Sequence, residues 1–165
     1  MKIVLRLILL AALAALGVWL WTVLFPSPEK VIRRRLVELA RTVSSPPNES
    51  DLTRLAVARS VAGFFSAPVE LKLAIPELGQ RDSIDREEIT AMVLMVRSRA
   101  GGLRVNFPDI NVTVAPDRHS AVANLTVDAT ISGERDRLLQ EMKFTLRQID
   151  GQWLITRVET VQTLS

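Results

Sequence analysis

The sequence of 165 residues contains no cysteine and a single histidine. Without cysteine the chain has no disulfide, no thiolate metal ligand and no cysteine nucleophile. With His119 as the one imidazole, a conventional structural zinc site is also excluded. We therefore expect neither a metal site nor a cofactor.

Motifs that carry chemistry are equally scarce. There are only 7 glycines, and they form no phosphate-binding loop and no nucleophile elbow. The acidic residues Asp82, Asp85, Glu87 and Glu88 stand where a helix is expected to begin, so capping and compensation of the helix dipole explain them better than paired catalysis. His119 follows Pro116-Asp117-Arg118 in an expected turn and is interpreted as an ordinary, water-facing residue. No catalytic residue is assigned.

Positive charge is unevenly distributed. The formal net charge is +3, and seven basic residues (Lys2, Arg6, Lys30, Arg33, Arg34, Arg35 and Arg41) precede residue 42. After residue 41 the chain has 14 basic and 16 acidic side chains, so this part is nearly neutral. A basic face for nucleic acid is therefore not expected there.

One long apolar run is present, at residues 7–25, and Thr22 is its only polar member. As a helix it would be roughly 28 Å long, close to the thickness of the bilayer hydrocarbon. The alternative is a cleaved signal peptide, for which the small-x-small triplet Ala15-Leu16-Gly17 would be the cleavage site. Eight mostly bulky apolar residues follow that triplet, which favours an uncleaved anchor. We expect an anchor region at residues 1–27 and a globular domain at residues 28–165.

The orientation of this anchor is indicated by two opposing features. A short basic N-terminus before an apolar run is typical of an anchor that exports the following domain. Against this, five Lys or Arg residues lie within about 16 residues after the run. Because Arg33, Arg34 and Arg35 fall in an expected helix, we favour export. Their side chains are interpreted as a solvated helix face near lipid headgroups, with a specific acidic-lipid site as the alternative.

Hydrophobic periodicity predicts three helices and several strands. Apolar residues at helical spacing indicate helices at residues 28–44, 51–65 and 86–99, with Asn48 or Ser50 capping the second and a capping box of Asp85 and Glu88 opening the third. Alternation predicts strands at residues 69–75, 103–114, 121–131, 142–147 and 152–162. The result is an α+β fold in which a curved antiparallel sheet packs against three helices.

At this point the chain resembles the nuclear-transport-factor-2-like superfamily, over about residues 28–164. The resemblance rests on element order and on the segments VAGFFSAPVEL, IDREEI and DGQWLITRVET. It implies a cone-shaped domain but no single activity, because the superfamily includes enzymes, binders and scaffolds.

The resemblance also bears on function. Isomerase-type members use a tyrosine, which this chain lacks, and dehydratase-type members use His and Asp groups in the cavity. We therefore favour a non-catalytic interaction or scaffold domain, with a protein partner or a second copy of the chain. The layout is similar to the bitopic scaffold subunits of bacterial type IV secretion machines, which implies a bacterial inner membrane and a periplasmic domain. The alternative is a binder of a small apolar ligand, or an isomerase or hydratase, using the cone.

The last hairpin holds the charged site candidates. Asp150-Gly151 predicts a type I′ turn, and a regular ladder from this turn places Leu146 opposite Ile155, Phe144 opposite Arg157 and Met142 opposite Glu159. Arg157 and Glu159 then lie on the more apolar face, where they should pair, reach the wet mouth of the cone or contact a ligand. Seven residues are the candidates for a ligand-binding cavity: Phe64, Phe65, Phe107, Phe144, Trp153, Arg157 and Glu159.

Overall fold

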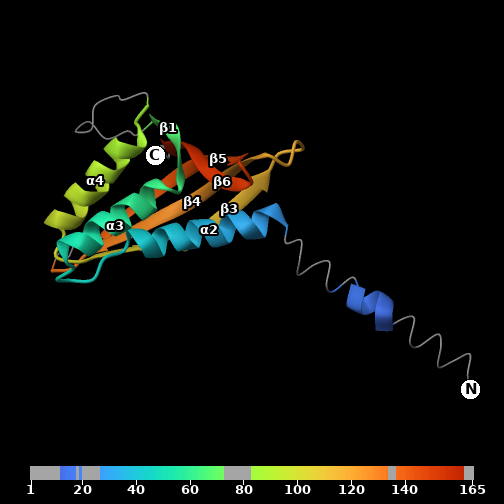
Figure 1. Cartoon of the computed structure of the whole chain (residues 1–165), viewed down its shortest axis with the longest axis horizontal. Helices are drawn as coiled ribbons and strands as arrows, with labels where there is room; N and C mark the ends of the chain where they lie inside the picture. Colours follow the sequence, from blue (N-terminus) through green and yellow to red (C-terminus); the bar gives the residue numbers. More distant parts are fainter. Residues whose placement is uncertain (1–11, 18, 20–26, 73–82, 134–136, 162–165) are drawn as a thin grey trace, which may run out of the picture.

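The structure, a computed structural model, describes residues 12–17, 19, 27–72, 83–133 and 137–161. Its elements follow the predicted order of helices and strands (Figure 1). They are α2 (Pro28–Val43), α3 (Asp51–Ala62), β1 (Phe65–Lys72), α4 (Arg86–Arg99), β2 (Leu103–Asn106), β3 (Ile110–Val114), β4 (Ser120–Ile131), β5 (Arg137–Ile149) and β6 (Gln152–Thr160).

Local sequence signals set the ends of the helices. Pro28 lies in the first turn of α2, where its missing N–H costs nothing. The side chain of Ser50 accepts a hydrogen bond from the Thr53 N–H at 3.3 Å, so Ser50 is the cap of α3. At α4 the carboxylate of Glu88 accepts from the Asp85 N–H at 3.1 Å, which confirms the predicted reciprocal contact.

The segment between α3 and β1 corrects one predicted boundary. The second helix was expected to reach Phe65, but α3 ends at Ala62 and β1 begins at Phe65. Phe64 and Phe65 are compatible with the apolar pattern of a helix and with that of a strand. Phe65 pairs with Ile155 of β6, and this long-range contact makes it the first residue of a strand. The predicted strand residues 73–75 lie outside the described residues.

The sheet is mixed rather than antiparallel as expected. The strand order is β1-β6-β5-β4-β2, and β3 also pairs with β4. Strand β1 runs parallel to β6, whereas the other pairs are antiparallel. The alternation within a strand carries no information about direction relative to a partner so distant in sequence, which is why the pattern missed this.

The predicted strand at residues 103–114 is two strands. Pro108 has no N–H for a ladder, and the chain leaves β2 after Asn106 and re-enters the sheet as β3 at Ile110. Both pieces pair with the long strand β4. The outer edge of β2 is covered by Ser45, which exchanges backbone hydrogen bonds with Leu103 at 2.7 and 3.0 Å.

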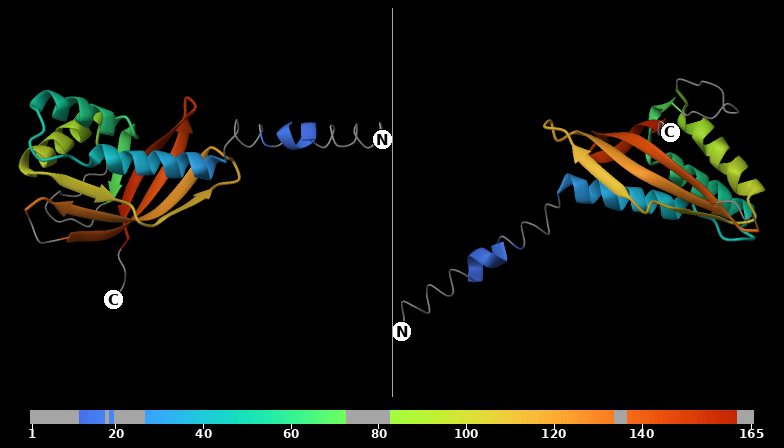
Figure 2. Two further views of the ribbon diagram at one scale, coloured as in Figure 1. Left: turned by 90° about the horizontal axis from the view of Figure 1, so that it is seen from below. Right: turned by 180° about the vertical axis from the view of Figure 1, so that it is seen from behind.

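The helices lie against one face of the curved sheet (Figures 1 and 2). The main core between them includes Ile32, Leu36, Phe144, Leu146 and Ile155. Every buried apolar residue of the described chain lies between Ile32 and Val158, so the domain has a core of its own.

The predicted membrane anchor falls mostly outside the described residues. Residues 12–17 and Trp19 are helical. Within the part of the chain that the structure describes, no helix combines the length and the apolar character needed to cross a bilayer.

Candidate functional site

The hairpin of β5 and β6 contains a β-bulge that decides where its charges lie. Asp150 and Gly151 have φ values of 50° and 77°, as a type I′ turn requires, and Leu146 pairs with Ile155 as predicted. The register then shifts between Leu146 and Thr145. One extra residue on β6 is accommodated around Thr156, whose hydroxyl donates to the Thr145 carbonyl at 3.2 Å.

The predicted register beyond the bulge is therefore wrong. Phe144 pairs with Val158 and not with Arg157, and Lys143 pairs with Glu159. Because one extra residue exchanges the two faces of a strand, Arg157 and Glu159 lie on the face opposite the core. Val158 takes the buried position and is 6 % exposed.

Arg157 and Glu159 are both ion-paired, but not with each other. The Arg157 Nε and Nη2 lie 2.7 and 2.6 Å from Oε2 of Glu70 on the edge strand β1. Glu159 Oε2 lies 3.4 Å from the Lys143 Nζ on β5. These charges compensate one another across strands, and Arg157 no longer shares a face with Phe144.

The Arg157–Glu70 pair should contribute little to stability. The two side chains are 38 % and 49 % exposed, and such surface pairs are worth about 0–1 kcal/mol. We expect Arg157→Met to lower the free energy of unfolding by less than about 1 kcal/mol in a urea titration. A double-mutant cycle with Glu70→Gln isolates the pair. A loss several times larger would indicate that Arg157 is buried and does not lie on the outer face of the sheet.

The five aromatic candidates are brought together in the interior. Phe64, Phe107, Phe144 and Trp153 belong to the main core, and Phe65 packs against it. The rings of Phe107 and Phe144 meet edge to face, with centroids 6.3 Å apart and an angle of 89°. These residues pack against one another, and their role as walls of a ligand cavity stays a prediction.

A buried ion pair that the sequence pattern did not reveal joins α4 to the loop after α2. The Arg97 Nη2 lies 2.6 Å from the Glu49 Oε1 and the Arg97 Nε 3.1 Å from Oε2. Both side chains are almost fully buried, with exposures of 2 % and 6 %. The geometry is bidentate, the strongest arrangement for such a pair.

The same guanidinium also closes the end of α2. The Arg97 Nη1 donates to the carbonyls of Thr42, Val43 and Ser44 at 3.1, 2.7 and 3.2 Å. Those carbonyls lack partners within the helix, so Arg97 satisfies them. The sequence did contain an indication of this role, because Arg97 recurs at the same helical spacing as Ile89 and Val93, on the side of α4 that packs into the core. With its donors engaged, Arg97 holds the fold together and offers nothing to a ligand.

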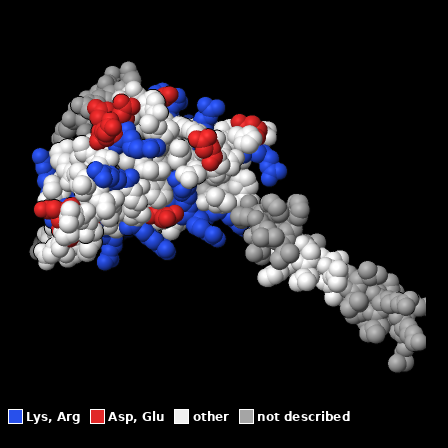
Figure 3. Space-filling model, in the orientation of Figure 1, with Lys and Arg blue, Asp and Glu red and all other residues white. Residues whose placement is uncertain are grey.

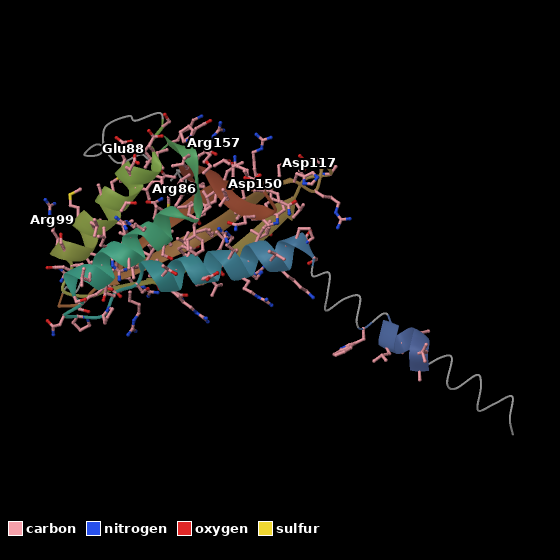
Figure 4. All side chains as sticks on the ribbon, in the orientation of Figure 1. Arg86, Glu88, Arg99, Asp117, Asp150 and Arg157 are labelled. Atoms are coloured by element: carbon pink, nitrogen blue, oxygen red, sulfur yellow. The ribbon has the colours of Figure 1, made fainter. Side chains whose placement is uncertain are left out.

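A further polar cluster lies at the β3–β4 turn, at the end of the molecule where α2 begins (Figures 1 and 4). Asp117 accepts from the Ser120 hydroxyl and from the N–H groups of His119 and Ser120, and these contacts lower the pKa of its carboxyl. His119 is exposed, as predicted, and its Nδ1 lies 3.0 Å from the Gln148 Oε1. The cluster fixes a turn.

The lowered pKa of Asp117 gives a pH prediction with a definite sign. The stabilisation by the ionised carboxylate is complete above the unfolded-state pKa, about 3.9, and disappears as the pH falls through the lower folded-state pKa. We expect Asp117→Asn to be less stable than the native chain at pH 7, and the difference to shrink in acid. Urea unfolding across this range measures it. A difference that stayed constant with pH would contradict the ionised contact.

Comparisons with known proteins give a clear answer only for the fold. No protein-family model matches the sequence, and no curated protein does either. Among solved structures, a protein assigned as a scytalone dehydratase from Novosphingobium aromaticivorans superposes with a TM-score of 0.61 and 16% identity, over 82% of this chain and 83% of its own. A nuclear-transport-factor-2-like protein of unknown function from Pseudomonas putida gives 0.62 and 14%, over 83% and 87%. The chain has the nuclear-transport-factor-2-like fold.

A third structure, a protein of unknown function with a cystatin-like fold from Nostoc punctiforme, gives a TM-score of 0.56 and 13% identity, over 81% of this chain and 91% of its own. These three superpositions each cover more than four fifths of the chain, so the shared fold extends over most of it. Sequence identities this low carry the fold and leave the activity to be argued from the residues.

Proposed function

We propose that the protein is a single-pass, membrane-anchored, non-catalytic domain that binds another protein or a second copy of itself. The anchor is the apolar segment at residues 7–25, and the domain begins at Pro28. Its location would be a bacterial inner membrane with the domain in the periplasm.

One observation carries the non-catalytic part of this proposal. The charged residues predicted beside the aromatic core, Arg157 and Glu159, are moved by the bulge to the outer face and are paired there. An enzyme of this fold would need a desolvated acid or base in its interior. Among the described residues, the buried charged pair of Arg97 and Glu49 is fully engaged in holding α2 and α4.

A second candidate is a binder or enzyme that takes a small apolar ligand. It is favoured by the likeness in shape to the protein assigned as a scytalone dehydratase, together with the aromatic interior. It would require the cluster of Phe64, Phe107, Phe144 and Trp153 to admit a ligand.

Crosslinking of the full-length chain in intact cells, followed by identification of the crosslinked species, separates the two candidates. We expect a defined protein complex or a dimer. Recovery of monomer alone, together with a small molecule retained by the purified protein, would favour the second candidate. A C-terminal alkaline phosphatase fusion tests sidedness: an inactive fusion at normal expression would contradict a periplasmic domain.

A further inference from the structure

Helix α2 presents a basic stripe on its exposed side. Lys30, Arg33, Arg34 and Arg41 are all exposed, and at about 100° per residue they fall within an arc of roughly 100° around the helix axis. The buried residues of the same helix, Ile32, Leu36, Leu39 and Ala40, fall in a separate arc whose centre lies roughly 120° around the axis from the centre of the stripe. The helix therefore has one face for the core and one basic face for the surroundings.

The four side chains are free for an external partner. None of them forms an ion pair or a side-chain hydrogen bond with any residue that the structure describes, whereas other arginines are engaged. The neighbouring Arg35 shows the contrast, since it donates to the Gly63 carbonyl at 3.2 Å and lies 4.9 Å over the ring of Phe64. The run of three arginines is thus divided, with two facing outward and one packing on the segment between α3 and β1.

The stripe is also the place where the positive charge of the domain concentrates. Helix α2 contains five basic residues and only Glu29 and Glu38 as acids, while the chain after it is nearly neutral. Figure 3 shows Lys and Arg atoms gathered along the edge of the molecule that α2 forms. An anionic surface that approached this edge would meet little opposing charge.

We propose that this stripe binds the anionic headgroups of phospholipids and lays α2 along the membrane surface. The inference rests on the anchor proposed above, because residues 7–25 end three positions before Pro28 and bring the stripe within reach of the headgroups. Basic side chains next to an anionic leaflet are attracted over about a Debye length, roughly 8–10 Å. From Lys30 to Arg41 the stripe extends over roughly 16 Å of helix, so all four can face the same surface.

The contact would be electrostatic and not an insertion. An interfacial helix that embeds in lipid uses an apolar face, but the apolar face of α2 is already covered by the sheet. High salt should therefore release the helix while the anchor holds the chain in the bilayer.

Because the chain has no cysteine, a single fluorophore can report this contact. We would replace Glu38, which is exposed beside the stripe, with cysteine and label it in the full-length protein. Asn124→Cys, exposed on the outer face of the sheet, is the control site. The proteins are reconstituted into phosphatidylcholine vesicles with or without one-third phosphatidylglycerol, and nitroxide on the headgroups quenches a nearby label.

We expect strong quenching at position 38 in the anionic vesicles, weak quenching in neutral vesicles or high salt, and weak quenching at position 124 throughout. Changing all four stripe residues to Gln should lower the ratio of docked to free domain at least about fivefold, the effect of roughly one basic residue. The matched control changes Arg59, Arg99, Arg104 and Arg147 to Gln and should leave the ratio unchanged. Equal quenching in both vesicles, or equal effects of the two quadruple variants, would overturn the proposal.

Flotation of the same samples separates this inference from the anchor. A chain that floats with both vesicles but shows no charge-dependent quenching has an anchor and no headgroup contact. Flotation with anionic vesicles alone would overturn the anchor and still support the contact, and flotation with neither would overturn both. If a DNA duplex changed the fluorescence of the label at position 38 while anionic lipid did not quench it, the stripe would be assigned to nucleic acid and the proposal would be overturned.

Discussion

Replacing Arg97 with Met is expected to lower the free energy of unfolding by about 3–5 kcal/mol. The change leaves the buried Glu49 carboxylate without its cation and removes the donor from the three carbonyls at the end of α2. Native domains are stable by only about 5–15 kcal/mol, so this is a large share of the total. Urea unfolding of the chain from Ser27 onward, followed by circular dichroism, measures the loss.

Arg99 provides a matched control on the same helix. It lies two residues further along α4, is exposed, and Arg99→Met should change stability by less than about 0.5 kcal/mol. Adding Glu49→Met to Arg97→Met should recover part of the loss, because the unpaired buried carboxylate is removed as well. Equal effects of Arg97→Met and Arg99→Met would show that Arg97 is not buried in an ion pair.

Replacing Phe144 with Ala is expected to cost about 3–5 kcal/mol, the usual range for truncating a buried phenylalanine. Phe144 is 5 % exposed and meets Phe107 edge to face, so the substitution removes both buried area and an aromatic pair. Leu139→Ala on the same strand is the control. Leu139 is 56 % exposed, and its loss should be small in the same urea titration.

The same residue tests the bulged register. Phe144 and Val158 are cross-strand neighbours in the structure, so a double-mutant cycle of Phe144→Ala and Val158→Ala should give a coupling of about 0.5–3 kcal/mol. The corresponding cycle of Phe144→Ala with Arg157→Met should give a coupling near zero. A coupling of Phe144 with Arg157 and none with Val158 would indicate that the ladder is regular and that Arg157 lies on the core face.

Much of the fold could be predicted because it depends on local rules. Helix α4 has the predicted bounds and α2 ends one residue early, since a proline, a capping box and a helical apolar stripe act within a few residues. The Asp150-Gly151 turn and the pairing next to it are also local. The direction of β1 relative to β6 depends on residues far apart in the chain, and no local pattern specifies it.

The candidate site was harder to predict because it depends on a single extra residue. The Asp150-Gly151 turn predicts regular pairing of β5 with β6, and this predicted pairing is correct only from the turn to Leu146. The buried residues of β6 change parity across the bulge, from Trp153 and Ile155 at odd positions to Val158 at an even one. Leu154 is apolar as well, so the sequence pattern alone did not mark the change. Charged residues are seldom buried, so an apolar pattern did not identify Arg97 as a core residue although it stands at a core position of α4.

The parallel pairing of β1 with β6 has a consequence for the order in which the domain can fold during synthesis. The Arg157–Glu70 contact joins residues 87 positions apart, and the second strand of the pair follows all the other described helices and strands in the sequence. Until β6 has emerged from the ribosome, β1 has, among the described residues, no strand to pair with and only the isolated bridge between Val69 and Ile84. Contacts so distant form slowly and late. The nascent domain must therefore stay incomplete until β6 (Gln152–Thr160) has been synthesised, and a stop codon before Gln152 would leave a sheet that cannot close.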